Sequence, residues 1–359
     1  MGGGKQLKNS NDGAIVAKIK SIYGKRIQKS QLIELSNCKN VNSIAAYLKA
    51  NTNYSKILET IDENTVHRGQ LESILKQQNF NNYEKIYYYL SKNNLLIFKL
   101  IIEEFEMIEI LKMILLLNAN NTKEYIINLP TYLISKCNVD LLKLAKIKTY
   151  EELLNILKHT HYHKILKKLK PSEENQKIDY FTCEHNLFEQ FFERMFETIR
   201  RGVKKSERKE LENLMKLRID HINICRIYRL KFLLNESAEK IGKLIFKFHK
   251  ILNKEKIDNL INSTTNKEFG QKFEKFFHIA ETSKTLRNQF EKRNFYIENF
   301  MAKLDYKICK RLIHISNNFS VVFCAFHKLS QIEISNLIYA IEGVRYGVMA
   351  KEIQELYVI

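Results

Sequence analysis

Residues that interrupt helices are scarce in this sequence, which has 2 prolines and 11 glycines among 359 residues. Proline removes a backbone donor and glycine raises the entropic cost of ordering, so both weaken regular elements. Valine and threonine are also sparse, and no run of alternating apolar and polar residues is bounded by hairpin turns. Isoleucine, leucine, lysine, glutamate and asparagine dominate instead. We therefore expect an all-α fold.

The sequence also has no Cys-x-x-Cys pair. Its six cysteines are scattered along the chain, at Cys38, Cys137, Cys183, Cys225, Cys309 and Cys324. This spacing argues against a disulfide framework and against a cysteine-based zinc site. It is typical of buried thiols in a reducing compartment.

Neither a secretory signal nor a membrane-spanning segment is evident. The first residues, MGGGKQLKNSNDGA, lack the apolar core of a signal peptide, and we expect residues 1–13 to form a disordered tail. A spanning helix needs about 20 predominantly apolar residues, whereas the apolar stretch Leu95–Ile102 contains Lys99 and runs into Glu103. We expect any membrane contact to be peripheral.

The usual motifs of catalytic and cofactor sites are missing as well. No Gly-x-x-x-x-Gly-Lys-Ser/Thr loop is present to cradle nucleotide phosphates. In the run His159-Thr-His161-Tyr-His163, the middle histidine falls on a different helix face from the other two, and no carboxylate cluster completes a metal site. We expect no catalytic residue, no metal and no cofactor, and hence a protein that is not an enzyme.

Positive charge is in excess, with 59 Lys and Arg against 40 Asp and Glu and a net charge of +19. A charge of this size favours association with acidic surfaces. Lysine is nevertheless spread over the whole chain and forms no single tract. An AT-rich genome that encodes exposed positions as Lys, Asn and Ile is the simpler explanation.

What the sequence does contain is an acid-led helical pattern that occurs three times. The copies are Glu106–Lys112, Asp220–Arg226 and Glu333–Tyr339, and their first residues are separated by 220 − 106 = 114 and 333 − 220 = 113 positions. Asn223 and Asn336 follow the acid by three residues in the second and third copies, where the first copy has a glutamate at position 109. A spacing of three places both polar groups on one side of a helix.

The third copy belongs to the clearest amphipathic stretch, Glu333–Gly347. Its apolar residues recur at i, i+3, i+4 and i+7, as in one buried stripe of a helix: Ile334, Leu337, Ile338 and Ile341. We expect Gly343 and Gly347 to end this helix, because helix ends favour a residue that tolerates positive φ. Residues 349–359 are expected to form a short tail.

A second landmark repeats at a similar period. Thr52-Asn-Tyr54 matches Thr160-His-Tyr162, at a separation of 160 − 52 = 108, and each is followed by Lys, Ile and Leu at equivalent positions. A third copy, near residues 264–273, is too degraded to identify. Repeats of this length are domain-sized and longer than solenoid units. We therefore expect three helical repeats, at residues 14–122, 123–236 and 237–359.

Within the first repeat, two helices are expected with particular clarity. Ala14–Tyr23 is the first, and Gly24 ends it. The apolar and charged stretch Tyr83–Leu117 is expected to form a single long helix.

The chain resembles the C subunit of the bacterial and archaeal V-type ATPases, which is related to the d subunit of the eukaryotic V-ATPase. The segments that carry the resemblance cover essentially the whole chain, and they are Ala14–Gly24, Ala46–Leu48 with Thr52-x-Tyr54, Asp220-x-x-Asn223-x-x-Arg226, Glu333-x-x-Asn336-Leu and Glu342-Gly-x-Arg345-Tyr-Gly347. The triple repeat is itself a property of that family.

This resemblance implies three helical domains arranged about a pseudo-threefold axis as a funnel. It further implies a non-catalytic rotor subunit that sits on the membrane rotor ring, receives the tip of the central shaft and transmits torque. The implied partners are the central-shaft subunits of the D and F type and the rotor ring, on the cytoplasmic side of the membrane. Whether the machine moves H⁺ or Na⁺, and whether it hydrolyses or makes ATP, stays open.

The resemblance and the pattern together give two classes of candidate residue. We expect the acid–asparagine landmarks to cap helices or to bridge segments through buried hydrogen bonds, since a satisfied buried polar group fixes packing register. Exposed contacts with partners are expected at Arg345 and Tyr346, beside the glycines at a helix end, and Arg226 is a further candidate.

The alternative hypothesis is a basic helical module that binds nucleic acid. It rests on the charge of +19 and on 18 tyrosines. It predicts steeply salt-dependent binding of DNA or RNA, and a filter-binding titration with no retention at low salt would remove it. The even spread of lysine and the absence of a recognisable helix-turn-helix or aromatic platform argue against it.

Overall fold

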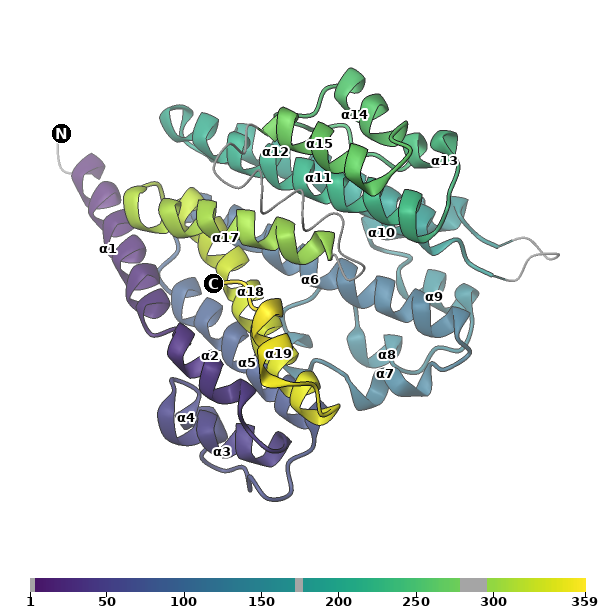
Figure 1. Cartoon of the computed structure of the whole chain (residues 1–359). Coiled ribbons are helices and arrows are strands. Elements are labelled where there is room, and N and C mark those ends of the chain that lie inside the picture. Colours follow the sequence, from purple (N-terminus) through teal and green to yellow (C-terminus); the bar gives the residue numbers. More distant parts are fainter. Residues whose placement is uncertain (1–3, 172–176, 278–295) are drawn as a thin grey trace. The chain divides into compact units, whose positions relative to one another are not determined.

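The computed structural model describes residues 4–171, 177–277 and 296–359, and over these residues it is helical throughout, with no β-strand (Figure 1). The expectation of an all-α fold is confirmed. No described helix is both long and apolar enough to cross a lipid bilayer.

The helices follow one another through short connections. In the first half of the chain they are α1 (Gly4–Gly24), α2 (Lys29–Ser36), α3 (Val41–Asn51), α4 (Ser55–Leu58), α5 (Arg68–Tyr87), α6 (Lys92–Asn118), α7 (Lys123–Ile127), the 3₁₀ turn η1 (Thr131–Leu133), α8 (Leu141–Leu144), α9 (Tyr150–Ile156) and α10 (His161–Lys168). In the second half they are α11 (Tyr180–Gly202), α12 (Lys205–Tyr228), the π-helical turn η2 (Arg229–Leu233), α13 (Ala238–Lys243), α14 (Lys254–Ile261), α15 (Asn266–Phe277), α17 (Ile297–Ile315), α18 (Phe319–Arg345) and α19 (Ala350–Leu356).

The chain divides into two compact units. One comprises residues 1–106, 119–156 and 302–359, and the other comprises residues 107–118 and 157–301. These units do not coincide with the three expected segments, 14–122, 123–236 and 237–359, whose division stays a prediction.

The order of the helices nevertheless repeats along the chain. Two long helices followed by a short one occur three times, as α5–α6–α7, α11–α12–α13 and α17–α18–α19. Short helices come next in the first two cases, α8 to α10 and then α14 and α15. After α19 the chain ends, and the corresponding short helices are found at its beginning as α2 to α4. The chain thus starts part-way through the repeated pattern.

Three residues with positive φ mark the same place in each copy. Among the described residues, the non-glycine residues in this region are Asn120 and Asn235, each at φ 52°, and the single glycine is Gly347 at φ 67°. Their separations, 235 − 120 = 115 and 347 − 235 = 112, match the period of the acids. Asparagine and glycine are the residues that adopt this conformation most readily. Each lies just beyond the end of a long acid-bearing helix or of its π-helical extension.

The π-helical turn η2 accounts for the one irregularity in this spacing. The acid precedes the positive-φ residue by 14 positions in the first and third copies (120 − 106 and 347 − 333), whereas Asp220 precedes Asn235 by 15. A π turn accommodates one extra residue inside a helix, and η2 lies between these two positions. The second copy therefore carries a one-residue insertion at this point.

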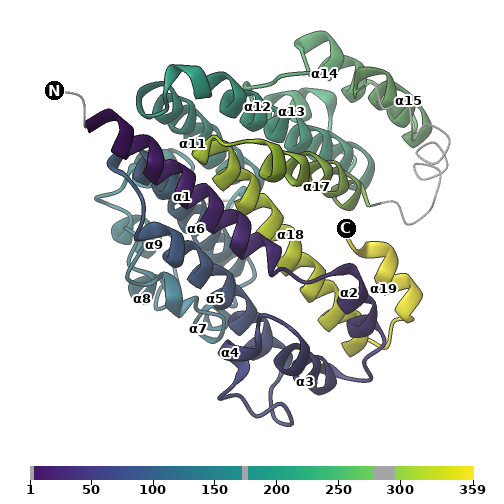
Figure 2. The same ribbon diagram turned by 90° about the vertical axis from the view of Figure 1, so that its left-hand side faces the viewer.

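Helix α18 is the centre of the first unit. It packs against α1, α2, α3, α5 and α19, and Figure 2 shows it running beside α1 with α2 and α19 near its end. Its fully buried side chains include Leu337 and Ile341, which join Leu35, Leu71 and Leu75 in one apolar cluster. Burial of such side chains stabilises a fold by roughly 1.5–3 kcal/mol each.

The end of α18 differs from the sequence prediction. Gly343 does not end the helix, which continues to Arg345. A Cβ atom at position 343 would lie 2.5 Å from Cγ1 of Ile353, so this glycine allows close approach of α19. Gly347 has the predicted role, because its N–H bonds to the Val344 carbonyl at 3.2 Å while the Val348 N–H bonds to the Gly343 carbonyl at 2.9 Å. These two bonds form a Schellman motif.

Three further helix boundaries also differ. The stretch Tyr83–Leu117 is two helices, because α5 ends at Tyr87 and Ser91 begins α6, with its Oγ accepting the Asn94 N–H at 3.4 Å. Helix α1 begins at Gly4, inside the expected tail of residues 1–13, and ends at Gly24 as predicted. The expected tail of residues 349–359 contains helix α19.

Candidate functional site

The three landmark acids have the same kind of partner. Each lies buried on a long helix, and each accepts backbone N–H groups from a segment that precedes a short helix. Glu106 on α6 accepts the N–H of Asn138, shortly before α8. Asp220 on α12 accepts the N–H groups of Lys250 at 3.0 Å and Ile251 at 2.6 Å, shortly before α14.

The third acid connects the two ends of the chain. Glu333 on α18 accepts the N–H of Ile27 at 3.4 Å, two residues before α2, and the hydroxyl hydrogen of Tyr54 at 3.0 Å. The donors recur at the period of the acids, since 138 − 27 = 111 and 250 − 138 = 112. The acid of each copy therefore holds the start of the following short-helix set, and the third acid holds the start of the first.

The asparagines that accompany the acids hold the backbone in a second place. Asn223 is fully buried, and its amide donates to the carbonyl of Phe246 at 3.0 Å and accepts the N–H of the same residue at 2.9 Å. Asn336 makes the same pair of bonds with Val358, both at 2.9 Å. The expectation that these landmarks bridge segments through buried hydrogen bonds agrees with this geometry.

Burial changes the titration of two of the acids. Desolvation raises the pKa of Glu333 to about 7, although the hydrogen bonds from Tyr54 and Ile27 oppose the shift. Desolvation also raises the pKa of Asp220, and the N–H bonds from residues 250–252 again oppose it. A buried carboxyl favours its neutral form unless enough donors stabilise the charge.

The tyrosine landmarks are both buried. The hydroxyl of Tyr54 bonds to Glu333, and burial raises its pKa well above the usual value. Tyr162 is 1% exposed on α10, with its ring centroid 3.9 Å from that of His161. No cluster of His, Cys, Asp or Glu among the described residues has the composition and geometry of a metal site.

Arg226 lies inside its unit. Its side chain is 10% exposed, and its guanidinium donates to Oε2 of Glu184 at 2.7 Å and to the carbonyl of Leu244 at 2.8 Å. It also lies 4.1 Å above the ring of Phe246, and burial together with its charge lowers the pKa of His185 to about 4. This geometry assigns Arg226 to a link between α11, α12 and the segment after α13.

Arg345 and Tyr346 lie at the exposed end of α18. Tyr346 is 70% exposed, and the guanidinium of Arg345 lies 5.1 Å from its ring centroid. Met349 in the following turn is 66% exposed. Arg345 and Arg68 both approach Glu342, so the end of the helix has a small charged network beside exposed apolar groups. We call residues 345–349 the α18 tip.

Comparisons with known proteins agree with the triple pattern. A model of the ATP synthase (C/AC39) subunit family matches residues 15–356. The chain is similar to the C subunit of the A-type ATP synthase of Desulfurococcus sp. (strain SY), with 25% identity over 261 residues that span 71% of this chain and 68% of that protein. It is similar to the same subunit of Thermococcus onnurineus (strain NA1), 27% over 230 residues, or 64% and 59% of the two chains. The corresponding protein of Thermococcus kodakarensis (strain ATCC BAA-918 / JCM 12380 / KOD1) is 24% identical over 271 residues, or 74% and 70%.

Proposed function

The chain belongs to the ATP synthase (C/AC39) subunit family, and on this basis we propose that it is a non-catalytic central-stalk subunit of a rotary ATPase or ATP synthase. In this role it is a socket that joins the rotating shaft to the membrane rotor ring. Its partners are the shaft subunits of the D and F type and the ring, on the cytoplasmic side of the membrane. It transmits torque, and the chemistry of ATP takes place in other subunits.

The observation that carries this proposal is the bond between Glu333 and the start of the chain. Glu106 and Asp220 each hold the segment about 30 residues after them, at 138 − 106 = 32 and 250 − 220 = 30. Glu333 has too little chain after it for such a contact, and it holds Ile27 instead. A pattern whose last copy is completed by its first residues supports a closed arrangement of three repeats, which is the geometry that a socket around a shaft requires.

The buried hydrogen bonds also support a role in torque transmission. A torque adaptor has to resist deformation, and satisfied buried polar groups fix one packing register. Each asparagine bridge ties a short segment to a long helix through two bonds to one residue, as Asn336 does with Val358. Loss of such a bridge is therefore expected to loosen the connection without removing a chemical group from any active site.

We propose the α18 tip as a contact with a partner in the complex. Tyr346 and Met349 expose apolar surface beside the charge of Arg345, and tyrosine and arginine are among the residue types most enriched at interface hot spots. Arg226 has an internal role in this proposal, because its donors already have partners inside the chain.

Co-expression with the shaft and ring subunits tests the proposal. We expect the chain to copurify with both, and to bridge them when neither binds the other directly. The double change Arg345→Ala with Tyr346→Ala is expected to weaken the binding of one partner at least tenfold, because truncating a hot-spot residue costs about 2 kcal/mol or more. Lys146→Ala with Lys148→Ala, at exposed positions around α8 and α9, is the control. A chain that binds neither partner would contradict the proposal.

A further inference from the structure

The first unit contains a polar cavity with a volume of about 650 Å³ between α1, α4 and α5. Two helix faces form much of its wall. Lys18, Ser21, Ile22 and Lys25 recur on α1 and the residue after it at i, i+3, i+4 and i+7, and Gln78, Asn81, Asn82 and Lys85 recur on α5 with the same spacing. Facing helix stripes in a protein interior are normally apolar. These two stripes are mostly polar and enclose open space.

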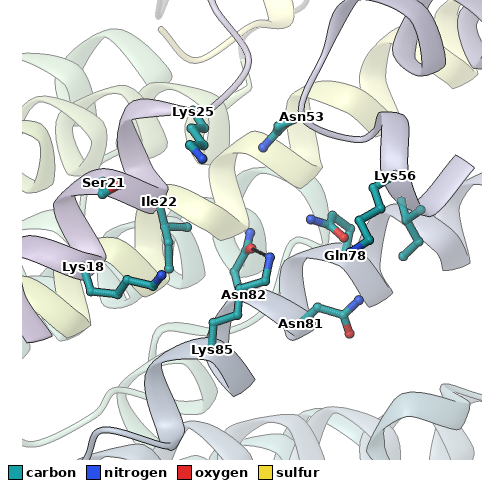
Figure 3. Close-up of a pocket in the computed structure, with 11 residues that line it drawn as sticks. Lys18, Ser21, Ile22, Lys25, Asn53, Lys56, Gln78, Asn81, Asn82 and Lys85 are labelled. Atoms are coloured by element: carbon teal, nitrogen blue, oxygen red, sulfur yellow. Dashed lines mark hydrogen bonds between the residues drawn. The ribbon is translucent and has the colours of Figure 1, made fainter.

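Four lysines line this cavity, and no carboxylate does. Lys18 and Lys25 come from the α1 side, Lys56 from α4 and Lys85 from α5, and Figure 3 shows them approaching the same space from different sides. Within the described part of the chain none of the four forms an ion pair. Lys85 has a single polar partner there, Oδ1 of Asn82 at 3.3 Å. We call this set of residues the lysine pocket.

The electrostatics of the pocket are unfavourable when it is empty. The pKa of Lys85 is lowered, first by burial and then by repulsion from Lys18, Lys25 and Lys56. Like charges held together in this way favour the binding of an anion, because the anion restores the charged form of each group. The neighbouring small cavity shares Asn53 and Asn82 with the pocket, and its acid, Glu333, is buried and already accepts hydrogen bonds from Ile27 and Tyr54.

Amide side chains complete the set of polar groups. Asn53, Gln78, Asn81 and Asn82 line the wall and supply neutral donors and acceptors. The Oδ1 atom of Asn53 is buried and, within the described residues, accepts no hydrogen bond. Ammonium and amide donors around one cavity are the groups that recognise phosphate oxygens.

We propose that the lysine pocket binds a small ligand that carries two or more phosphate groups. Four ammonium groups on three separate elements exceed what a single phosphate neutralises or spans. The volume lies within the range of about 300–1,000 Å³ that suits small-molecule ligands. No aromatic side chain lines the pocket to stack on a nucleobase, so the phosphate groups, and not a base, provide the recognition. The ligand is either a soluble polyphosphate or a multiply phosphorylated lipid headgroup.

Calorimetric titration of the full chain with inorganic tripolyphosphate tests the proposal. We expect saturable binding that weakens steeply as salt rises, and much weaker binding of orthophosphate. The change Lys25→Gln with Lys85→Gln is expected to reduce the affinity for tripolyphosphate at least tenfold, because each lost charge-assisted contact is worth more than a neutral hydrogen bond. The control Lys146→Gln with Lys148→Gln removes the same charge from exposed positions outside the pocket.

A second measurement locates the bound ligand without a variant. Acylation of lysine amines, read by mass spectrometry, is expected to be suppressed by tripolyphosphate at Lys18, Lys25, Lys56 and Lys85, and unchanged at Lys146 and Lys148. This result supports the proposal even if the double variant fails to fold. Equal protection of all six lysines would show adsorption by overall charge and would overturn it.

Vesicles distinguish the two sources of the ligand. If a lipid headgroup is the ligand, vesicles that contain a bisphosphorylated phosphoinositide should bind the chain more tightly than phosphatidylserine vesicles of equal charge, and tripolyphosphate should compete. If a soluble ligand is preferred, tripolyphosphate binds without a vesicle preference. Absence of binding to either probe at low salt, or equal weakening by the control variant, would overturn the proposal. Failure here leaves the proposed rotor role unaffected, because copurification with shaft and ring does not depend on this pocket.

Discussion

At the scale of single residues, the fold depends on buried polar side chains that hold backbone groups. An amide that bonds both the N–H and the C=O of one residue cannot be replaced by an apolar side chain without leaving two buried groups unpaired. The sequence pattern located these side chains but not their partners. Ile27 and Val358 contribute only backbone atoms to the bonds, and backbone atoms carry no sequence signal.

Asn336→Ala tests this reasoning most simply. The variant leaves the N–H and C=O of Val358 without partners, and we expect the free energy of unfolding to fall by about 2–4 kcal/mol, because each unsatisfied buried group costs about 1–3 kcal/mol. Urea unfolding followed by circular dichroism measures the difference. Asn93→Ala, at an exposed position of α6, should change stability by less than about 0.5 kcal/mol. A loss of equal size in both variants would contradict the assignment.

Glu333 predicts a pH dependence of stability. Its pKa rises from 4.5 in the unfolded chain to about 7 in the folded one, so the folded state retains the proton that the unfolded state loses. The contribution of this group is therefore complete below pH 4.5 and is lost as pH rises through about 7, at a slope of at most about 1.4 kcal/mol per pH unit.

Glu333→Gln removes this titration while keeping the shape of the side chain. We expect the stability of the wild-type chain relative to the variant to fall between pH 5 and pH 7.5 and to level off above that range. Urea unfolding at a series of pH values measures the difference. Parallel curves for the two proteins would show that Glu333 is ionised throughout, and would sink the prediction.

At the scale of helices, the repeated order of elements was partly predictable. Long helices such as α18 have strong periodicity, so the sequence predicts them. Short ones such as α8 and α19 have few residues of their own to stabilise them and form because tertiary contacts hold them, as the close approach of α19 to Gly343 does. This is why the last eleven residues were predicted to be a tail and are found to contain a helix.

Gly343→Ala tests the contact between α18 and α19. The added methyl would lie 2.5 Å from Cγ1 of Ile353, and we expect a loss of about 1–3 kcal/mol in the free energy of unfolding, as for other overpacked sites. Gly13→Ala on α1 meets no atom within 4 Å and should be neutral or stabilising by up to about 1 kcal/mol.

A double variant separates this contact from any general effect of alanine in the helix. Shortening the partner in Gly343→Ala with Ile353→Val should recover part of the loss that Gly343→Ala alone produces, because the crowded atoms belong to the Ile353 side chain. Additive losses in the double variant would show that the glycine is required for another reason.

At the scale of the whole molecule, the sequence predicted the helical fold, the family and the period of the pattern. It did not predict that the chain starts part-way through that pattern, because the bond that reveals this joins Glu333 to residue 27, across 306 positions. Nor did it predict the lysine pocket. The spacing of Lys18, Ser21, Ile22 and Lys25 was a signal, but an even spread of lysine along the chain concealed it.

The central claim, that this chain couples shaft and ring, is tested most directly in membrane vesicles that contain the complete ATPase. ATP hydrolysis and ion uptake are measured together, before and after the chain is depleted and again after purified chain is added back. We predict that depleted vesicles build no ion gradient whatever their rate of hydrolysis, and that adding the chain back restores the gradient. Ion uptake that continues undiminished without the chain would contradict the account.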